Sequence, residues 1–133
     1  PFIRLLDETF TLDDIRKTEV SLTIESEDEY VLKDKSPMTK ISRDILDLVN
    51  QAMNEHHQYP DGMALFTGTL FAPTQDRDQQ GEGFTHKIGD IVSIEAPKLG
   101  RLQNRVNYTH LIAPWEFGMG ALMKNLGGRG LLH

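Results

Sequence analysis

Two hydroxyl side chains flank a glycine at Thr67, Gly68 and Thr69, directly after the apolar run of residues 63–66. That run has the composition of a central strand covered on both faces. A glycine at a strand end lets a ligand approach the backbone closely, and threonine hydroxyls can donate hydrogen bonds to carboxylate oxygens. The segment therefore predicts a binding site for a small acid, and an ordinary strand end with a bulge is an equally weighted alternative.

A second pair of candidates, His86 and Lys87, lies in the polar connection of residues 70–89. Histidine titrates near neutral pH and can transfer a proton, and lysine can meet an anion. A polar loop histidine that bonds to the backbone is the more ordinary interpretation. These two residues are therefore secondary candidates for catalytic groups, behind the Thr-Gly-Thr segment.

Carboxylates could bind a hard metal ion, because Mg²⁺ and Ca²⁺ prefer oxygen ligands. The acidic segment of residues 25–29 is better explained as a solvated turn between two strands. Asp76, Asp78 and Glu82 in the long polar loop remain a minor alternative. No spacing of the five histidines suggests zinc. The sequence therefore assigns no metal ligand within this chain.

The chain has 133 residues, a formal net charge of −6 and no cysteine. Its length predicts one domain over residues 1–133. The negative charge, without a basic cluster, argues against nucleic acid and anionic membranes and favours small molecules or proteins as partners. Absence of cysteine excludes disulfides. No apolar run is long enough to span a membrane and no leader is recognisable, so we expect a cytoplasmic protein.

Apolar periodicity predicts an α+β fold. Val20, Leu22 and Ile24 alternate with polar residues as in a half-buried strand, which residues 29–33 would pair with as a hairpin. A helix is expected within residues 40–55, capped by Thr39 or Ser42. A second helix should begin at Pro114 and stop at Gly127. Further strands are expected over residues 63–69, 89–96 and 100–108.

Several motifs resemble the C-terminal part of the fumarylacetoacetate hydrolase family. In that family a Thr-Gly-Thr strand end is followed by a variable loop, a Gly-Asp step and a Gly-x-Leu-x-Asn-x-Val pattern. The last pattern is matched by Gly100, Leu102, Asn104 and Val106. The PW-x-FG and NL-x-x-RGLL motifs near the end are similar to members that act on 2-keto-3-deoxy sugar acids. The resemblance extends from about residue 17 to the end.

This resemblance implies a mixed β-sheet roll with peripheral helices, usually assembled as a dimer. It implies an enzyme in which Mg²⁺, Mn²⁺ or Ca²⁺ assists carbon–carbon hydrolysis, decarboxylation or dehydration of a 2-keto acid or β-diketone. The family's substrate-carboxylate contact corresponds to Gly68 and Thr69, and Thr67 belongs to the same motif. The loop that follows would border the pocket, which favours a role for His86 and Lys87.

The family's metal site, a Glu-x-Glu pair plus an aspartate, precedes the matched region. The chain begins at Pro1 inside what looks like running sequence. The resemblance therefore implies the C-terminal half of an enzyme, inactive alone, that forms a homodimer or pairs with an N-terminal half. Two alternatives remain: a non-catalytic binding or dimerisation module, and one subunit of a split enzyme. The family's Pro-x-Gly after Thr-Gly-Thr is replaced by residues 70–73, which leaves the substrate open.

Overall fold

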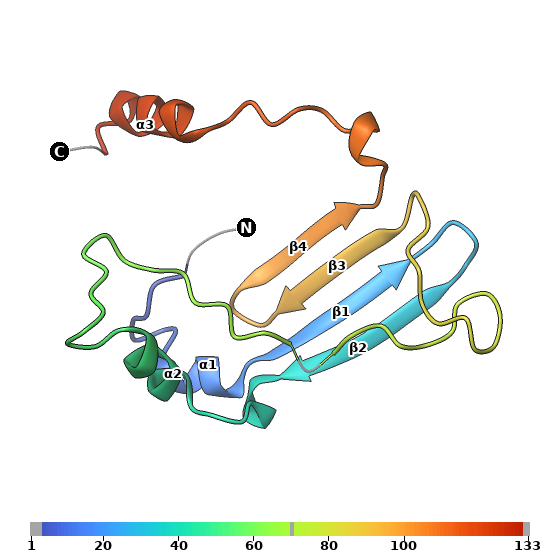
Figure 1. The fold of residues 1–133 in the computed structure, drawn as a ribbon, viewed down its shortest axis with the longest axis horizontal. Helices are drawn as coiled ribbons and strands as arrows, with labels where there is room; N and C mark the ends of the chain where they lie inside the picture. Colours follow the sequence, from blue (N-terminus) through green and yellow to red (C-terminus); the bar gives the residue numbers. More distant parts are fainter. Residues whose placement is uncertain (1–3, 70, 132–133) are drawn as a thin grey trace.

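The computed structural model describes residues 4–69 and 71–131. Four strands form one antiparallel sheet in the order β2-β1-β3-β4 (Figure 1). The strands are β1 (Glu19–Glu25), β2 (Val31–Pro37), β3 (Ile91–Ala96) and β4 (Gly100–Arg105). The α+β prediction and the predicted β1–β2 hairpin are confirmed. All pairings among these strands are antiparallel, so the described residues do not form the mixed sheet that the resemblance implies.

Alternation along the strands separates an apolar face of the sheet from a polar face. Val20, Leu22 and Ile24 of β1 lie on the apolar face, and Leu22 stands opposite Ile94 of β3. Ile24 and Leu32 are each only 1% exposed. Phe10 and Ala96 are also buried. The buried core is therefore small and is centred on the β1–β2 hairpin.

The β3–β4 hairpin explains one glycine of the family-like pattern. Leu99 N–H donates to Ala96 O at 3.1 Å across the loop, and Gly100 has φ +84°. Lys98, within this loop, also has a positive φ, of +63°. Glycine adopts the left-handed region at little cost, which explains the residue type at Gly100.

The first predicted helix is shorter than expected. Residues Met38–Lys40 form the single turn η1, and α2 covers only Ile45–Ala52. The predicted caps Thr39 and Ser42 are wrong, because Asp44 accepts a hydrogen bond from Leu46 N–H at 2.9 Å. Asp44 also pairs with Arg16 of α1 (Leu12–Lys17) at 2.6 Å. This pair connects the start of α2 to the element that precedes β1.

The predicted buried strand over residues 63–69 is wrong. The segment is irregular and mostly exposed, and the Phe66 side chain is 92% exposed. An apolar run becomes a strand only where a neighbouring strand supplies hydrogen bonds and packing. Within the described ranges no strand pairs with this segment. Its apolar composition therefore does not place it in the sheet.

The second predicted helix begins later than expected. α3 covers Met119–Gly128, with Gly118 as its extended N-cap, so the predicted start at Pro114 is wrong. The predicted stop at Gly127 lies inside the helix, and the chain turns at Gly130, which has φ +67°. Beyond β4 the chain passes through η2 (Thr109–Leu111) to α3, away from the sheet (Figure 1). In the part of the chain that is described, no helix has the length and apolar character to cross a membrane.

Candidate functional site

The Thr-Gly-Thr segment lines a cavity of about 210 Å³ together with the end of β2 and the chain that follows it. We refer to this cavity as the Thr-Gly-Thr pocket. Its described lining contains four hydroxyl side chains and one lysine and no carboxylate. The lining residues are Ser36, Pro37, Met38, Lys40, Ile41, Ser42, Thr67, Gly68 and Thr69. The structure thus brings the three predicted binding residues to one pocket, although the segment that carries them is not a strand.

The end of β2 and the turn η1 position the lysine and serine side of the pocket. Met38 N–H donates to Thr18 O at 2.8 Å, which attaches the turn to the start of β1. Ile41 N–H donates to Met38 O at 3.1 Å and closes the turn. These backbone bonds hold Lys40 at the pocket while its side chain remains exposed.

Gly68 has φ +75°, and a Cβ atom built there would meet no heavy atom within 4 Å. The left-handed backbone therefore explains the glycine at this position, since steric crowding by the described residues does not. Thr69 Oγ1 accepts a hydrogen bond from Phe71 N–H at 3.1 Å. This bond orients the Thr69 side chain along the wall of the pocket.

The charge of the pocket differs from that of the chain. The chain carries a net charge of −6, whereas the only charged side chain of the described lining is that of Lys40. Lys40 has no ion pair with any described residue, whereas Lys35 and Lys98 pair with acids at 2.5 and 2.9 Å. An ammonium group beside hydroxyl donors can bind a carboxylate. The pocket is therefore suited to a small anion.

An apolar hollow of about 220 Å³ adjoins the Thr-Gly-Thr pocket. The two share Ser36 and Thr69 as lining residues. The remaining lining of the hollow is mainly apolar and comes from the sheet and from the chain after Thr69: Val20, Leu22, Asp34, Lys35, Phe71, Pro73 and Ile94. A ligand held by its carboxylate in the pocket could therefore place a carbon chain against this wall.

A buried charge cluster lies at the other end of β1. Arg77 donates to both carboxylate oxygens of Asp90, at 2.6 and 2.9 Å. Ser26 Oγ accepts from Arg77 Nη2 at 2.7 Å and donates to Asp90 at 2.7 Å. The Arg77 and Asp90 side chains are 2% and 0% exposed. We call Arg77, Asp90 and Ser26 the Arg77–Asp90 cluster.

The hydrogen bonds of this cluster favour the charged form of Arg77 and the charged form of Asp90. The hydrogen bonds from Arg77 hold the pKa of Asp90 well below its ordinary value, and those to Asp90 raise the pKa of Arg77. The Arg77 guanidinium also lies 4.7 Å over the Tyr30 ring, a cation–π contact. The family-like Gly-Asp step thus has a structural role here, attaching the loop of residues 71–89 to the sheet.

His86 and Lys87 lie beside the Arg77–Asp90 cluster. His86 Nδ1 is 3.5 Å from Asp90 Oδ2, and the His86 ring packs edge-on against Phe84. Lys87 Nζ donates to Asp28 at 2.8 Å and to Asp78 at 2.6 Å. The bond from Lys87 lowers the pKa of Asp28 to about 2. Lys87 is therefore occupied by two carboxylates.

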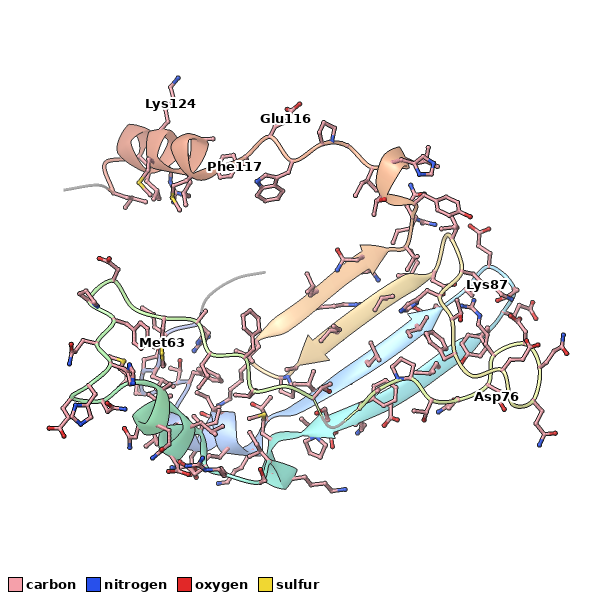
Figure 2. All side chains as sticks on the ribbon, in the orientation of Figure 1. Met63, Asp76, Lys87, Glu116, Phe117 and Lys124 are labelled. Atoms are coloured by element: carbon pink, nitrogen blue, oxygen red, sulfur yellow. The ribbon has the colours of Figure 1, made fainter. Side chains whose placement is uncertain are left out.

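The start of the loop, at Phe71 and Pro73, borders the hollow beside the Thr-Gly-Thr pocket, whereas His86 and Lys87 lie at the other end of the sheet. Ile91, next to the cluster, pairs with Glu25 at one end of β1, whereas Ser36 of the pocket pairs with Val20 at the other. Five residues of strand separate these positions by roughly 17 Å. Figure 2 shows Lys87 and Asp76 at the end of the sheet remote from Met63. Neither His86 nor Lys87 lines the pocket.

The acidic residues of the loop do not form a metal site in the described ranges, 4–69 and 71–131. Asp76 accepts hydrogen bonds from Gly81 and Gly83 N–H, which lower its pKa. Asp78 is paired with Lys87. No three Asp, Glu or His residues gather there in a way that could hold a metal ion. These residues do not fit the divalent ion that the resemblance implies, so no reaction step is assigned to it.

Arg77 is the residue of this region that sequence reasoning missed. Its only sequence signal is a lone arginine among the acidic residues of the loop. Such a residue ordinarily lies on a solvated surface. Its burial follows from Asp90, which is thirteen positions away in the chain.

A substitution at Gly89, which precedes Asp90, tests whether the left-handed backbone explains the glycine of the Gly-Asp step. Its φ is +93°, and a Cβ atom would lie 3.5 Å from Glu27 Oε1. Gly89→Ala should therefore lower the free energy of unfolding by about 1–2 kcal/mol, the cost of the left-handed region for an L-residue. Urea denaturation measures this change. Gly120→Ala in α3, where φ is not positive, is the control and should leave the unfolding midpoint unchanged or raised; equal losses in both would contradict the explanation.

Comparison of the chain with protein-family models, curated proteins and solved structures gives no match. The family resemblance thus depends on the motifs in the sequence alone.

Proposed function

We propose that this chain is the acid-binding part of a divalent-metal-dependent hydrolase or lyase of the fumarylacetoacetate hydrolase type. Its substrate would be a 2-keto acid or a β-diketone, and its reaction carbon–carbon hydrolysis or dehydration. The observation that carries the proposal is the Thr-Gly-Thr pocket, where the motif meets Lys40 and the described lining contains no carboxylate. The rolled sheet of that family is part of the same proposal.

The chemistry of the pocket supports recognition of a carboxylate. Hydroxyl groups of Thr67 and Thr69 can donate hydrogen bonds to the two oxygens, and Lys40 supplies the opposite charge. Gly68 lets the ligand approach the backbone without a side chain in the way. A cavity of about 210 Å³ is below the usual size of a drug-like site and suits a small acid.

Catalysis in this proposal needs groups that the described residues do not supply. The resemblance places the metal ligands upstream of the matched region, and no described cluster of the chain fits a divalent ion. The chain would accordingly bind the acid and remain inactive alone. Mg²⁺, Mn²⁺ or Ca²⁺ belongs to the complete enzyme in this proposal.

A second candidate function, one subunit of a split enzyme or a non-catalytic binding module, is favoured by exposed aromatic residues. Phe66 is 92% exposed and Trp115 is 83% exposed. Leu111, Ile112 and Phe117, close to Trp115 in the chain, are exposed as well. Extensive apolar surface in water, unlike single exposed side chains, marks contact with another polypeptide. Co-purification with a specific second chain would distinguish the split enzyme from the module.

The pocket is tested by calorimetric titration of the chain with oxalate, a stable analogue of the enolate of a 2-keto acid. Thr69→Val should weaken oxalate binding by about 1–3 kcal/mol, because a charged oxygen loses its hydrogen-bond donor. Lys40→Met should weaken binding as well, since it removes the charge. Mg²⁺ should not strengthen the binding of oxalate if its ligands lie elsewhere.

Thr109→Val is the matched control, because Thr109 is exposed in η2 and does not line the pocket. Its oxalate affinity should equal that of the original chain. If Thr69→Val and Lys40→Met both bind oxalate as well as the control does, the Thr-Gly-Thr pocket is not the acid site. Clear binding that requires Mg²⁺ would instead reveal a metal site within this chain.

A further inference from the structure

A series of cavities leads from the Thr-Gly-Thr pocket across the sheet. The apolar hollow shares Ser36 and Thr69 with the pocket. It shares Val20 and Ile94 with a further cavity of about 210 Å³, which reaches Leu102 of β4. We call the hollow and this further cavity together the apolar groove. The pocket and the groove therefore follow one another from β2 to β4.

The floor of the apolar groove is the apolar face of the sheet. Leu22 stands opposite Ile94, and Ile94 stands opposite Leu102, so three apolar side chains form a row across β1, β3 and β4. Ile94 is 41% exposed and Leu102 is 39% exposed. Phe71 and Pro73 supply a second wall where the groove adjoins the pocket. Because this chain itself bounds the groove on two sides there, its shape is that of a small-molecule site, which is concave and mainly apolar with a few polar groups at one end.

Most charged side chains of the groove lining belong to the polar face of the sheet. Lys35, Glu95 and Arg101 lie in the next row across the strands, so alternation directs them away from the apolar face. Asp34 is the exception, and its Oδ1 accepts a hydrogen bond from Lys35 N–H at 2.6 Å. Beyond Asp34 and the end shared with the pocket, the described lining contains no hydroxyl or amide side chain. A ligand hydroxyl placed there would lose its bonds to water without gaining a partner.

We propose that the apolar groove binds the carbon chain of the acid whose carboxylate occupies the Thr-Gly-Thr pocket, and that this chain is aliphatic. The ligand class is a monocarboxylic 2-keto acid without hydroxyl groups on its chain, since Asp34 would repel a second carboxylate. This inference rests on the proposed acid-binding function and narrows its substrate class. It differs from the sugar acids that the sequence motifs favour. Three strand spacings separate β2 from β4, so the groove can follow a chain for roughly 14 Å.

Displacement of bound oxalate, followed by titration calorimetry, measures the affinity of a series of acids for the pocket and groove. The series is pyruvate, 2-oxobutanoate, 2-oxohexanoate and 2-oxooctanoate. Affinity should rise roughly two- to fourfold for each added methylene, because the half-open groove removes part of its surface from water. 2-Keto-3-deoxygluconate has as many carbons as 2-oxohexanoate and should bind roughly tenfold more weakly, because its hydroxyl groups find no partner. 1-Hexanol, which lacks a carboxylate, should not displace oxalate.

A matched pair of valine substitutions tests whether the groove is the site of the chain. Val20→Thr keeps the shape of the side chain and places a hydroxyl in the groove wall. The ratio of the affinities for 2-oxohexanoate and pyruvate should fall roughly three- to tenfold, because the aliphatic chain would cover that hydroxyl. Val31→Thr makes the same change on the opposite face of β2, where Val31 is 52% exposed, and should keep the ratio. Circular dichroism confirms that both variants are folded.

The outcomes separate this inference from the proposed function on which it rests. If no acid binds, oxalate included, both are overturned. If oxalate and pyruvate bind but affinity does not rise along the series, the acid pocket stands and the groove is not a ligand site. Equal affinity for 2-oxohexanoate and 2-keto-3-deoxygluconate, binding of the longer acids without displacement of oxalate, or equal effects of Val20→Thr and Val31→Thr would also overturn the inference. Rising affinity that Val20→Thr alone reduces would support it.

Discussion

Asp90→Asn is expected to lower the free energy of unfolding by about 3–5 kcal/mol, the loss typical when one partner of a buried ion pair is removed. The substitution keeps the shape of the side chain but leaves the guanidinium of Arg77, 2% exposed, without an opposite charge. Asn can accept on one oxygen only, whereas Asp90 receives bonds from Arg77, Ser26 and Lys87 N–H. Urea denaturation followed by circular dichroism measures the loss.

The control for this prediction is an ion pair of the same chemistry on the surface. Asp13 pairs with Lys17 at 2.7 Å, and the two side chains are 65% and 72% exposed. Asp13→Asn should change stability little, because water and salt screen the pair. If Asp90→Asn and Asp13→Asn have equal effects, Asp90 does not hold the loop to the sheet. Replacing Arg77 and Asp90 together by Met and Leu should recover part of the loss.

The Arg77–Asp90 cluster also determines whether the chain gains or loses stability as the pH falls. The pKa of Asp90 is lowered in the folded chain from its ordinary value of 3.8, mainly by the hydrogen bonds from Arg77. A lowered folded pKa contributes stability that is fully present above the unfolded value and is lost as pH falls below it. The chain should therefore lose stability progressively as the pH decreases from about 5. Asp90→Asn should flatten this dependence.

Leu32→Ala is expected to cost about 2–5 kcal/mol of unfolding free energy, the usual range for emptying a buried leucine site. Leu32 is 1% exposed and stands opposite Ile24, which is equally buried. The described core contains few other buried apolar side chains, so the neighbouring side chains cannot easily fill the cavity that the substitution creates. Thermal unfolding should show a large decrease of the midpoint.

Val31→Ala is the neighbouring control. Val31 is 52% exposed and lies on the opposite face of β2, so its truncation removes little buried surface. The unfolding midpoint of this variant should remain close to that of the original chain. Comparable decreases at residues 31 and 32 would mean that the core does not lie on the Leu32 face of the hairpin.

The stability and binding predictions concern different ends of one sheet. The Arg77–Asp90 cluster lies where β1 ends and β3 begins, and the Thr-Gly-Thr pocket lies where β2 ends. Substitutions at the cluster should therefore alter stability more than oxalate affinity. Substitutions at Thr69 and Lys40 should do the reverse, because both lie on accessible surface.

Periodicity in the sequence was sufficient to predict the four strands of the described sheet and the β1–β2 hairpin, but it also predicted a strand over residues 63–69 that does not form. Val20, Leu22 and Ile24 alternate with polar residues, and a half-buried strand needs only this local pattern. The acidic turn between β1 and β2 and the glycine after the β3–β4 loop are also local signals. The Thr-Gly-Thr motif could likewise be selected as a candidate binding segment from residue types alone, and its role is a proposal.

Tertiary structure decided which of these segments meet. Residues 63–69 have the composition of a strand, but the described part of the chain offers them no strand partner. Arg77 is buried because Asp90 lies opposite it, and Lys40 reaches the pocket because η1 follows the end of β2. Pairing partners, burial and the separation of His86 from the pocket depend on contacts between residues distant in the chain. A local pattern carries no information about such contacts, since the same side chain is stable in several surroundings.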